Sequence, residues 1–234
     1  MADVGTTVLD HDGPFSERDF RELTPRHGHV ELVEGTLLIG PMAGPAHGAA
    51  VAAVRASLEK ALPAGLRVVG ATPLRLGHDC VLVPDLMVAR VVEEPTAVQD
   101  PAPAPEVDAD ATGDEGAEPP AGASGETAEE PAVEEPAAEL LDSADVLMVV
   151  DVVDRTHGIA QRSFKPQLYA RSRIPYAVLV DSAARVGSAS MLIGGRHHEF
   201  ARAGVGEGLL LEEPFRVEID LAALAAADLR AADQ

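Results

Sequence analysis

The apolar run VLMVVDVV, residues 146–153, constrains the fold more than any other part of the sequence. Near-continuous valine-rich runs are typical of strands that are buried on both faces of a sheet. Asp151 interrupts this run, with two valines on each side of it. An ionised carboxylate in such a place is costly unless a partner, a metal ion or a raised pKa offsets the cost. The sequence therefore predicts a central strand that carries an unusual carboxylate.

One segment carries most of the net charge of −21. Residues 93–145 contain 17 acidic residues, eight prolines, no lysine or arginine and no aromatic residue. Such a segment cannot bury enough apolar area to offset its chain entropy, so we expect a disordered acidic insertion. Without it the chain has 22 acidic and 18 basic residues, a net charge of −4 that does not oppose nucleic-acid binding. The insertion suits a solvated loop; the alternatives are that it binds a basic partner or inhibits the protein by occupying a basic groove.

The segments on either side of the insertion are too short to be complete domains. We expect residues 15–92 and 146–227 to form a single α/β domain after a flexible N-terminus, 1–14. The patterns predict a helix from Ser16, a hairpin turning at Glu34-Gly35, a helix over 47–62 and strands at 66–69, 146–153 and 176–181. They also predict a strand, or a strand pair broken at Pro84, over 81–91, a helix over 167–172, a hairpin turning at Gly194-Gly195, and a strand with a short helix in 215–229. This mixed order predicts a mixed central β-sheet flanked by helices.

The number of cysteines and the lack of signal-peptide and transmembrane patterns in the sequence indicate a cellular location. The single cysteine, Cys80, excludes an internal disulfide framework and a cysteine-based zinc site. The N-terminal residues lack a signal-peptide pattern, and no apolar run has the roughly 18 residues of a transmembrane helix. We therefore expect a cytoplasmic protein.

Four polar residues stand next to, or inside, predicted sheet elements. Glu31 lies in the first predicted strand, Asp85 follows Pro84, Asp151 lies in the central strand, and Lys165 starts the next helix. Three carboxylates and an amine suit magnesium-dependent phosphodiester hydrolysis, because hard oxygen ligands hold Mg²⁺ and the ion activates water. A lysine can orient that water or stabilise charge on the phosphate.

Taken singly, most of these residues have simpler interpretations. Glu31 could face solvent on an edge strand, Asp85 could belong to a turn, and Lys165 could be a surface charge. His47 lies on the apolar face of its predicted helix, where it could be a core histidine or a contact to phosphate or substrate. Only Asp151 is difficult to explain as a structural residue.

The order ELVEG, GPMAGPAH, VPD, VVDVV, KPQLYA and IPYAVLVD resembles the Uma-two family, bacterial restriction-endonuclease-like proteins of the PD-(D/E)XK nuclease superfamily. The resemblance covers roughly residues 15–92 and 146–220. It implies a restriction-endonuclease-like core and Mg²⁺-dependent cleavage of DNA, with Mn²⁺ as a substitute. It also implies roles for single residues: Glu31, Asp85 and Asp151 as catalytic residues and metal ligands, Lys165 as the catalytic lysine, and His47 as a substrate-binding residue.

Two departures from the family pattern leave an alternative open. Asp151 stands where the family usually has glutamate, and the following loop reads DRTH with Gln161, so that Asp154 and His157 are candidates to join the site. The alternative is a catalytically weak or inactive nuclease-fold protein that binds nucleic acid or protein. A third hypothesis is a regulatory protein whose acidic tract recruits a basic partner. A homodimer would suit cleavage of both strands of a duplex.

Overall fold

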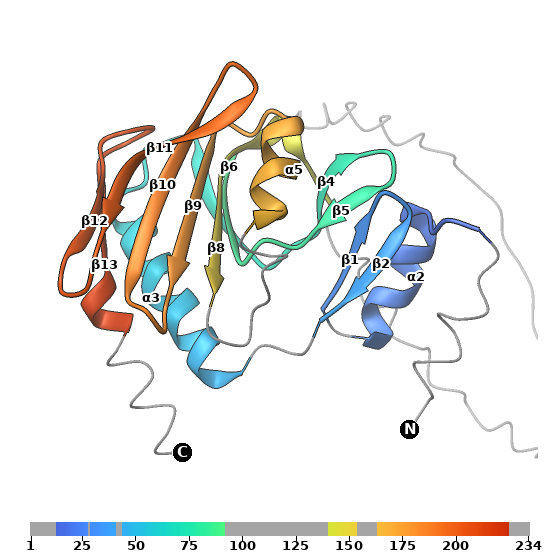
Figure 1. Cartoon of the computed structure of the whole chain (residues 1–234), viewed down its shortest axis with the longest axis horizontal. Helices are drawn as coiled ribbons and strands as arrows, with labels where there is room; N and C mark the ends of the chain where they lie inside the picture. Colours follow the sequence, from blue (N-terminus) through green and yellow to red (C-terminus); the bar gives the residue numbers. More distant parts are fainter. Residues whose placement is uncertain (1–12, 28, 41–43, 92–139, 154–162, 225–234) are drawn as a thin grey trace, which may run out of the picture. The chain divides into compact units, whose positions relative to one another are not determined.

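A six-stranded sheet forms the largest element of the structure (Figure 1). The computed structural model describes residues 13–27, 29–40, 44–91, 140–153 and 163–224. The strand order is β11-β10-β9-β8-β6-β3. The strands are β3 Leu66–Gly70, β6 Leu86–Arg90, β8 Val146–Val153, β9 Tyr176–Asp181, β10 Val186–Ile193 and β11 Arg196–Ala203. Only β8 and β9 pair in parallel, so the sheet is mixed, as predicted.

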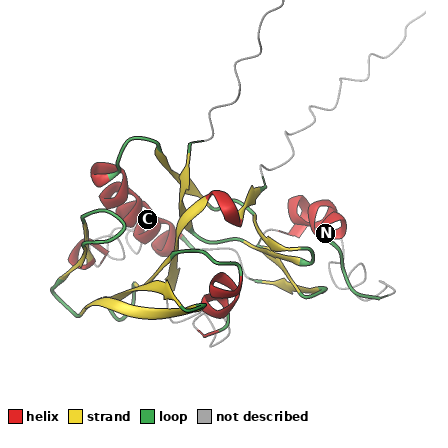
Figure 2. Cartoon of the chain, turned by 90° about the horizontal axis from the view of Figure 1, so that it is seen from above, coloured by secondary structure: helices red, strands yellow, loops and turns green. Residues whose placement is uncertain are grey.

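The two faces of β8 pack against different helices (Figures 1 and 2). Val150 and Val152 join a core with helix α3, Pro45–Ala61. Val149 joins another core with helix α5, Lys165–Arg171. Since side chains alternate along a strand, Asp151 shares the α5 side with Val149. The predicted central strand is therefore confirmed, and its carboxylate points toward α5.

Two smaller sheets complete the described fold. A five-stranded sheet has the order β2-β1-β5-β4-β7, and α2, Glu17–His27, packs on it through Phe20. Its strands are β1 Val30–Val33, β2 Thr36–Ile39, β4 Leu74–Gly77, β5 Cys80–Leu82 and β7 Leu141–Asp142. The hairpin of β12, Gly208–Leu211, and β13, Val217–Asp220, packs into the core on the α3 side.

The strand or strand pair expected over 81–91 is a pair of strands broken at Pro84, as the second alternative predicted, and the two strands belong to two sheets. Pro84 separates β5 from β6, because proline cannot donate to a strand ladder and restricts the residue before it. β5 pairs with β1, whereas β6 pairs with β3 and β8. Asp85 therefore lies at the crossing between the two sheets.

Local signals in the sequence are otherwise confirmed. Ser16 and Asp19 form the capping box of α2: the Ser16 amide donates to Asp19 at 2.8 Å and the Asp19 amide donates to the Ser16 hydroxyl at 3.3 Å. Glu34 and Gly35 turn the first hairpin with φ of 48° and 77°, a conformation that glycine adopts without strain. The Gly194-Gly195 turn joins β10 to β11 as expected.

The C-terminal boundary of the predicted insertion, 93–145, needs correction. Leu141 is buried beside Leu74, with which it pairs in the parallel β4–β7 ladder. Asp142 caps the 3₁₀ turn η1, Ser143–Asp145, by accepting from the Ala144 amide at 3.0 Å. An apolar side chain in the core and a capping carboxylate fix this stretch to the fold. The rest of the predicted insertion, the N-terminal 1–12 and residues 225–227 lie outside the described residues.

Candidate active site

A buried lysine links two of the predicted carboxylates. The Nζ atom of Lys165 lies 2.8 Å from Oε1 of Glu31 and 3.6 Å from Oδ1 of Asp151. Lys165 is the first residue of α5, Glu31 lies in β1, and Asp151 lies in β8. The three side chains are at most 10% exposed. The tertiary fold thus brings together residues from both main sheets and a helix.

Asp85 is fixed beside this cluster by hydrogen bonds to both of its oxygens. Oδ2 accepts from the backbone amide of Val152 at 2.7 Å, and Oδ1 lies 2.7 Å from Nε2 of His47. His47 is buried in the first turn of α3. All four predicted catalytic residues therefore converge, and His47 reaches the site through Asp85.

Glu31 is held in place by more than the lysine. Its Oε1 atom accepts a hydrogen bond from the backbone amide of Val83 at 2.9 Å, and Nε2 of His29 lies 3.7 Å away. Val83 lies in the segment between β5 and β6, next to Pro84 and Asp85. The same chain crossing therefore orients two of the three carboxylates.

Burial and mutual repulsion make this an electrostatically unusual site. The pKa of Asp151 is raised to about 6, chiefly because the carboxyl group is buried; Lys165 lowers this pKa, and the nearby Asp85 and Glu31 raise it. Burial alone would lower the pKa of Lys165, but the carboxylates of Asp151 and Glu31 outweigh this effect and raise it. Lys165 is thus an ammonium at neutral pH, which suits it to stabilise negative charge and not to accept a proton.

Tyr169 belongs to the site but was missed by sequence reasoning. It lies four residues after Lys165, so both side chains lie on one face of α5. Its hydroxyl is buried and makes no hydrogen bond of ordinary geometry. Burial and the charge of Asp151 raise its pKa well above the usual value. The signal in the sequence was the helical spacing of the lysine and the tyrosine in KPQLY.

The donor chemistry fits a hard divalent cation held by two carboxylates. Lys165 balances one of the three carboxylates, and the His47 ring lies beside another, that of Asp85. Among the described residues, no three His, Cys, Asp or Glu side chains converge as a metal cage would require. Mg²⁺ usually needs only one or two carboxylates together with water and substrate oxygens. Asp85 and Asp151 match that requirement, whereas Glu31 is occupied by Lys165.

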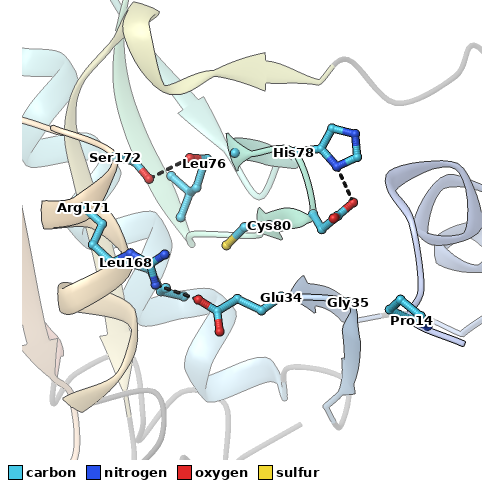
Figure 3. A pocket seen from close by; sticks show the side chains of 11 residues that line it. Pro14, Glu34, Gly35, Leu76, His78, Cys80, Leu168, Arg171 and Ser172 are labelled. Atoms are coloured by element: carbon cyan, nitrogen blue, oxygen red, sulfur yellow. Dashed lines mark hydrogen bonds and ion pairs between the residues drawn. The ribbon is translucent and has the colours of Figure 1, made fainter.

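A cavity of about 520 Å³ lies near the C-terminal end of α5, the end away from Lys165 (Figure 3). Its charged groups are already paired: Arg171 with Glu34 at 2.7 Å, and His78 with Asp79 at 2.8 Å. The thiol of Cys80 also lines it, and burial raises the pKa of this thiol to about 11. The cavity therefore lacks an activated nucleophile, and the cluster of carboxylates around Lys165 is the candidate site of catalysis.

Two comparisons with known proteins relate this chain to nuclease-like proteins. Residues 18–108 match the Uma2 family model, described as "Putative restriction endonuclease". The predicted family resemblance is confirmed. The Uma2 match includes Glu31, His47 and Asp85, whereas Asp151 and Lys165 lie beyond it and join the site through the fold.

A solved structure shares the fold. It is the crystal structure of "a putative nuclease belonging to DUF820" from Anabaena variabilis ATCC 29413. The sequences are 13% identical, and the TM-score is 0.55 over 92% of this chain and 99% of that one. This likeness confirms the predicted nuclease-like α/β fold. No curated protein matches the sequence.

The adjacent histidines of β11 have different surroundings. His198 is exposed, whereas the neighbouring His197 is half-buried and its Nε2 atom lies 2.9 Å from the Ile174 carbonyl. The two histidines are therefore not a metal pair. Asp154, His157 and Gln161 lie outside the described residues. None of the helices that the structure describes is long and apolar enough to cross a membrane.

Proposed function

We propose that this protein is a metal-dependent endonuclease that hydrolyses phosphodiester bonds of DNA. The observation that carries the proposal is the buried contact of Lys165 with Glu31 and Asp151. Asp85 lies beside them, because its carboxylate accepts a hydrogen bond from the amide of Val152, the residue after Asp151 in β8. A buried cluster rich in carboxylates is unfavourable for stability alone. Such a cluster is typical of sites where function requires the charge.

Each residue has a distinct role in this proposal. Asp85 and Asp151 would hold Mg²⁺, or Mn²⁺ in its place. When bound, such an ion supplies a Lewis acid for the phosphate and lowers the pKa of water. The Lys165 ammonium stabilises negative charge that develops on the phosphate. Glu31 positions that ammonium through the 2.8 Å contact, a different role from the metal ligand predicted from the sequence.

Hydrogen bonds from a backbone amide and a histidine ring fix the orientation of the Asp85 carboxylate. The Val152 amide and the His47 ring hold the two oxygens of Asp85, so that its carboxylate plane is fixed before substrate binds. Preorganised groups of this kind lower the barrier because they need no reorganisation during the reaction. A homodimer would present two such sites to a duplex.

Cleavage of supercoiled plasmid in Mg²⁺ and in Mn²⁺ tests the proposal. Wild-type protein is expected to nick or linearise the plasmid, whereas Asp85→Asn and Lys165→Met should lose about 10²-fold or more of the rate. Lys60→Met is a matched control, because Lys60 is the only other lysine of the chain and is exposed on α3.

Two results would contradict the proposal. One is absence of cleavage in either metal by folded wild-type protein, which would favour the nucleic-acid or protein-binding alternative. The other is equal loss of activity in Lys60→Met, which would show that the effect is not specific to the site. Replacing the plasmid with RNA of the same sequence tests the substrate class.

A further inference from the structure

A second, smaller cavity of about 190 Å³ adjoins Asp151 on the α5 side of the six-stranded sheet. Its floor is built from side chains of β9 and β10, and its walls come from α5 and β11. The lining includes Asp151, Pro166, Tyr169, Leu179, Ser188, Ser190 and His197.

The strand register connects this cavity to the candidate active site. Asp151 pairs with Leu179, and Leu179 pairs with Ser188, so the three side chains form a row across three neighbouring strands. Directly paired residues project from the same face of a sheet. With strands about 4.8 Å apart, Ser188 lies roughly 10 Å from Asp151. A nucleotide whose phosphate lies at Asp151 can therefore reach the cavity.

The lining offers neutral hydrogen-bonding groups. The hydroxyls of Ser188 and Ser190 make no hydrogen bond to any other residue that the structure describes. Nε2 of His197 donates to the Ile174 carbonyl, so Nδ1 is an acceptor in the neutral ring, and it is buried without a partner. The Tyr169 hydroxyl in the opposite wall is buried and interacts with the Asp151 carboxylate. Buried polar atoms normally have partners, so a bound group or water is expected here.

The charge and size of the cavity indicate which chemical class of ligand it can bind. Among the described residues, no lysine or arginine lines the cavity, and Asp151 stands at one end, so the cavity is unsuited to a phosphate. Leu179 and Pro166 add apolar surface, and the hydroxyls and the imidazole supply donors and acceptors. Its volume is below the 300 Å³ or more of ordinary drug-sized sites, so one flat ring system is the suitable size. A nucleobase combines such a ring with donors and acceptors along its edge.

We propose that this cavity binds an unpaired base of the nucleotide next to the cleaved phosphate. The inference rests on the proposed nuclease function and adds a substrate preference to it. Removing a base from a duplex stack costs free energy, and the cost is least where the base is mismatched or single-stranded. Substrates with an unpaired base near the cleavage point are therefore favoured over regular duplex.

The test measures, by fluorescence anisotropy, how tightly the Asp85→Asn protein binds two different single strands of DNA in a buffer that contains Ca²⁺. One is a labelled 12-nucleotide DNA, and the other has the same backbone with abasic sites throughout. The protein is expected to bind the base-bearing strand about tenfold more tightly. Ser190→Leu, which fills the cavity, should remove this preference without weakening binding of the abasic strand.

Two further variants make the result specific. Ser188→Val removes the other hydroxyl with a residue suited to a strand, and it replaces Ser190→Leu if thermal melting shows that the latter does not fold. Ser57→Leu on α3, on the opposite side of the sheet, is the control and should keep the preference.

The outcomes separate the two proposals. Equal binding of both strands by a protein whose wild type cleaves plasmid overturns the base-binding inference alone. Retention of the preference in both cavity variants also overturns it. Absence of binding to either strand, together with absence of cleavage, overturns the nuclease proposal and this inference with it.

Discussion

The Nζ atom of Lys165 lies 2.8 Å from Oε1 of Glu31, and both side chains are buried. The same Glu31 oxygen accepts the Val83 amide at 2.9 Å. Glu31 is therefore committed to holding the lysine, which distinguishes it from Asp85 and Asp151.

Glu31→Gln should slow cleavage by about 10²-fold while leaving the Mg²⁺ concentration for half-maximal rate unchanged. The amide keeps the shape of the side chain but removes the charge that positions Lys165. Rates measured across a Mg²⁺ titration check this expectation. In a Lys165→Met background the same change should have little further effect, since the group that Glu31 positions is gone. A large rise in the Mg²⁺ requirement would instead show that Glu31 is a metal ligand.

His47→Ala should raise the Mg²⁺ concentration for half-maximal rate by about 10- to 100-fold. His47 orients Asp85 through the 2.7 Å contact, and loss of such an outer partner typically weakens metal binding by that factor. KM for DNA should change little. His78→Ala removes an exposed histidine and is the control. A rise in KM alone would support the substrate contact predicted from the sequence.

Asp151→Asn should stabilise the metal-free protein at pH 8 and much less at pH 4. Burial raises the pKa of Asp151 from 3.8 to about 6, so the folded state binds this proton more tightly than the unfolded state. The ionised Asp151 carboxylate therefore destabilises the folded state little below pH 4, and this destabilisation reaches its full size above pH 6. The gain in the free energy of unfolding at pH 8 is on the order of 1–3 kcal/mol. Urea denaturation of both proteins at the two pH values measures it, and an equal gain at both would contradict the expectation.

Cys80 should react slowly with a thiol reagent, because burial raises its pKa to about 11. At pH 8 its thiolate fraction is about 10²-fold below that of an ordinary cysteine, and the rate should rise about tenfold per pH unit. Absorbance of the released chromophore follows the reaction. Modified protein should cleave DNA at an unchanged rate, since the Cys80 cavity is not the proposed site. Fast labelling at pH 8 would show that the thiol is not buried.

Replacing residues 93–139 with a Gly-Ser linker should leave the thermal midpoint nearly unchanged, whereas extending the replacement to 145 should lower it. The longer change removes Leu141 from the core, which costs about 1.5–3 kcal/mol, and deletes the β4–β7 pairing. Thermal melting compares the two variants. Tighter DNA binding by the shorter replacement would support self-inhibition by the acidic segment. Similar melting of both variants would show that β7 contributes little.

Much of the site was predictable because its residues break local patterns. Asp151 interrupts an apolar strand, and Asp85 follows a proline that ends one strand before another begins. Glu31 and Lys165 give weak signals alone, and only the family order of motifs singled them out. The capping box of α2 and both hairpin turns were also predictable, because each depends on residues at most three positions apart.

By itself, the sequence determined most of the helices and strands, among them the central strand, and the identity of the charged residues, since these follow from side-chain period and turn chemistry. Only the tertiary structure decided which charges are partners. Val83 and Val152 donate backbone amides to Glu31 and Asp85, and β5 and β6 belong to different sheets. It also decided that Tyr169 faces the site and that a cavity adjoins Asp151. These contacts join residues far apart in the chain, and a local period of 2.0 or 3.6 residues carries no information about such pairings.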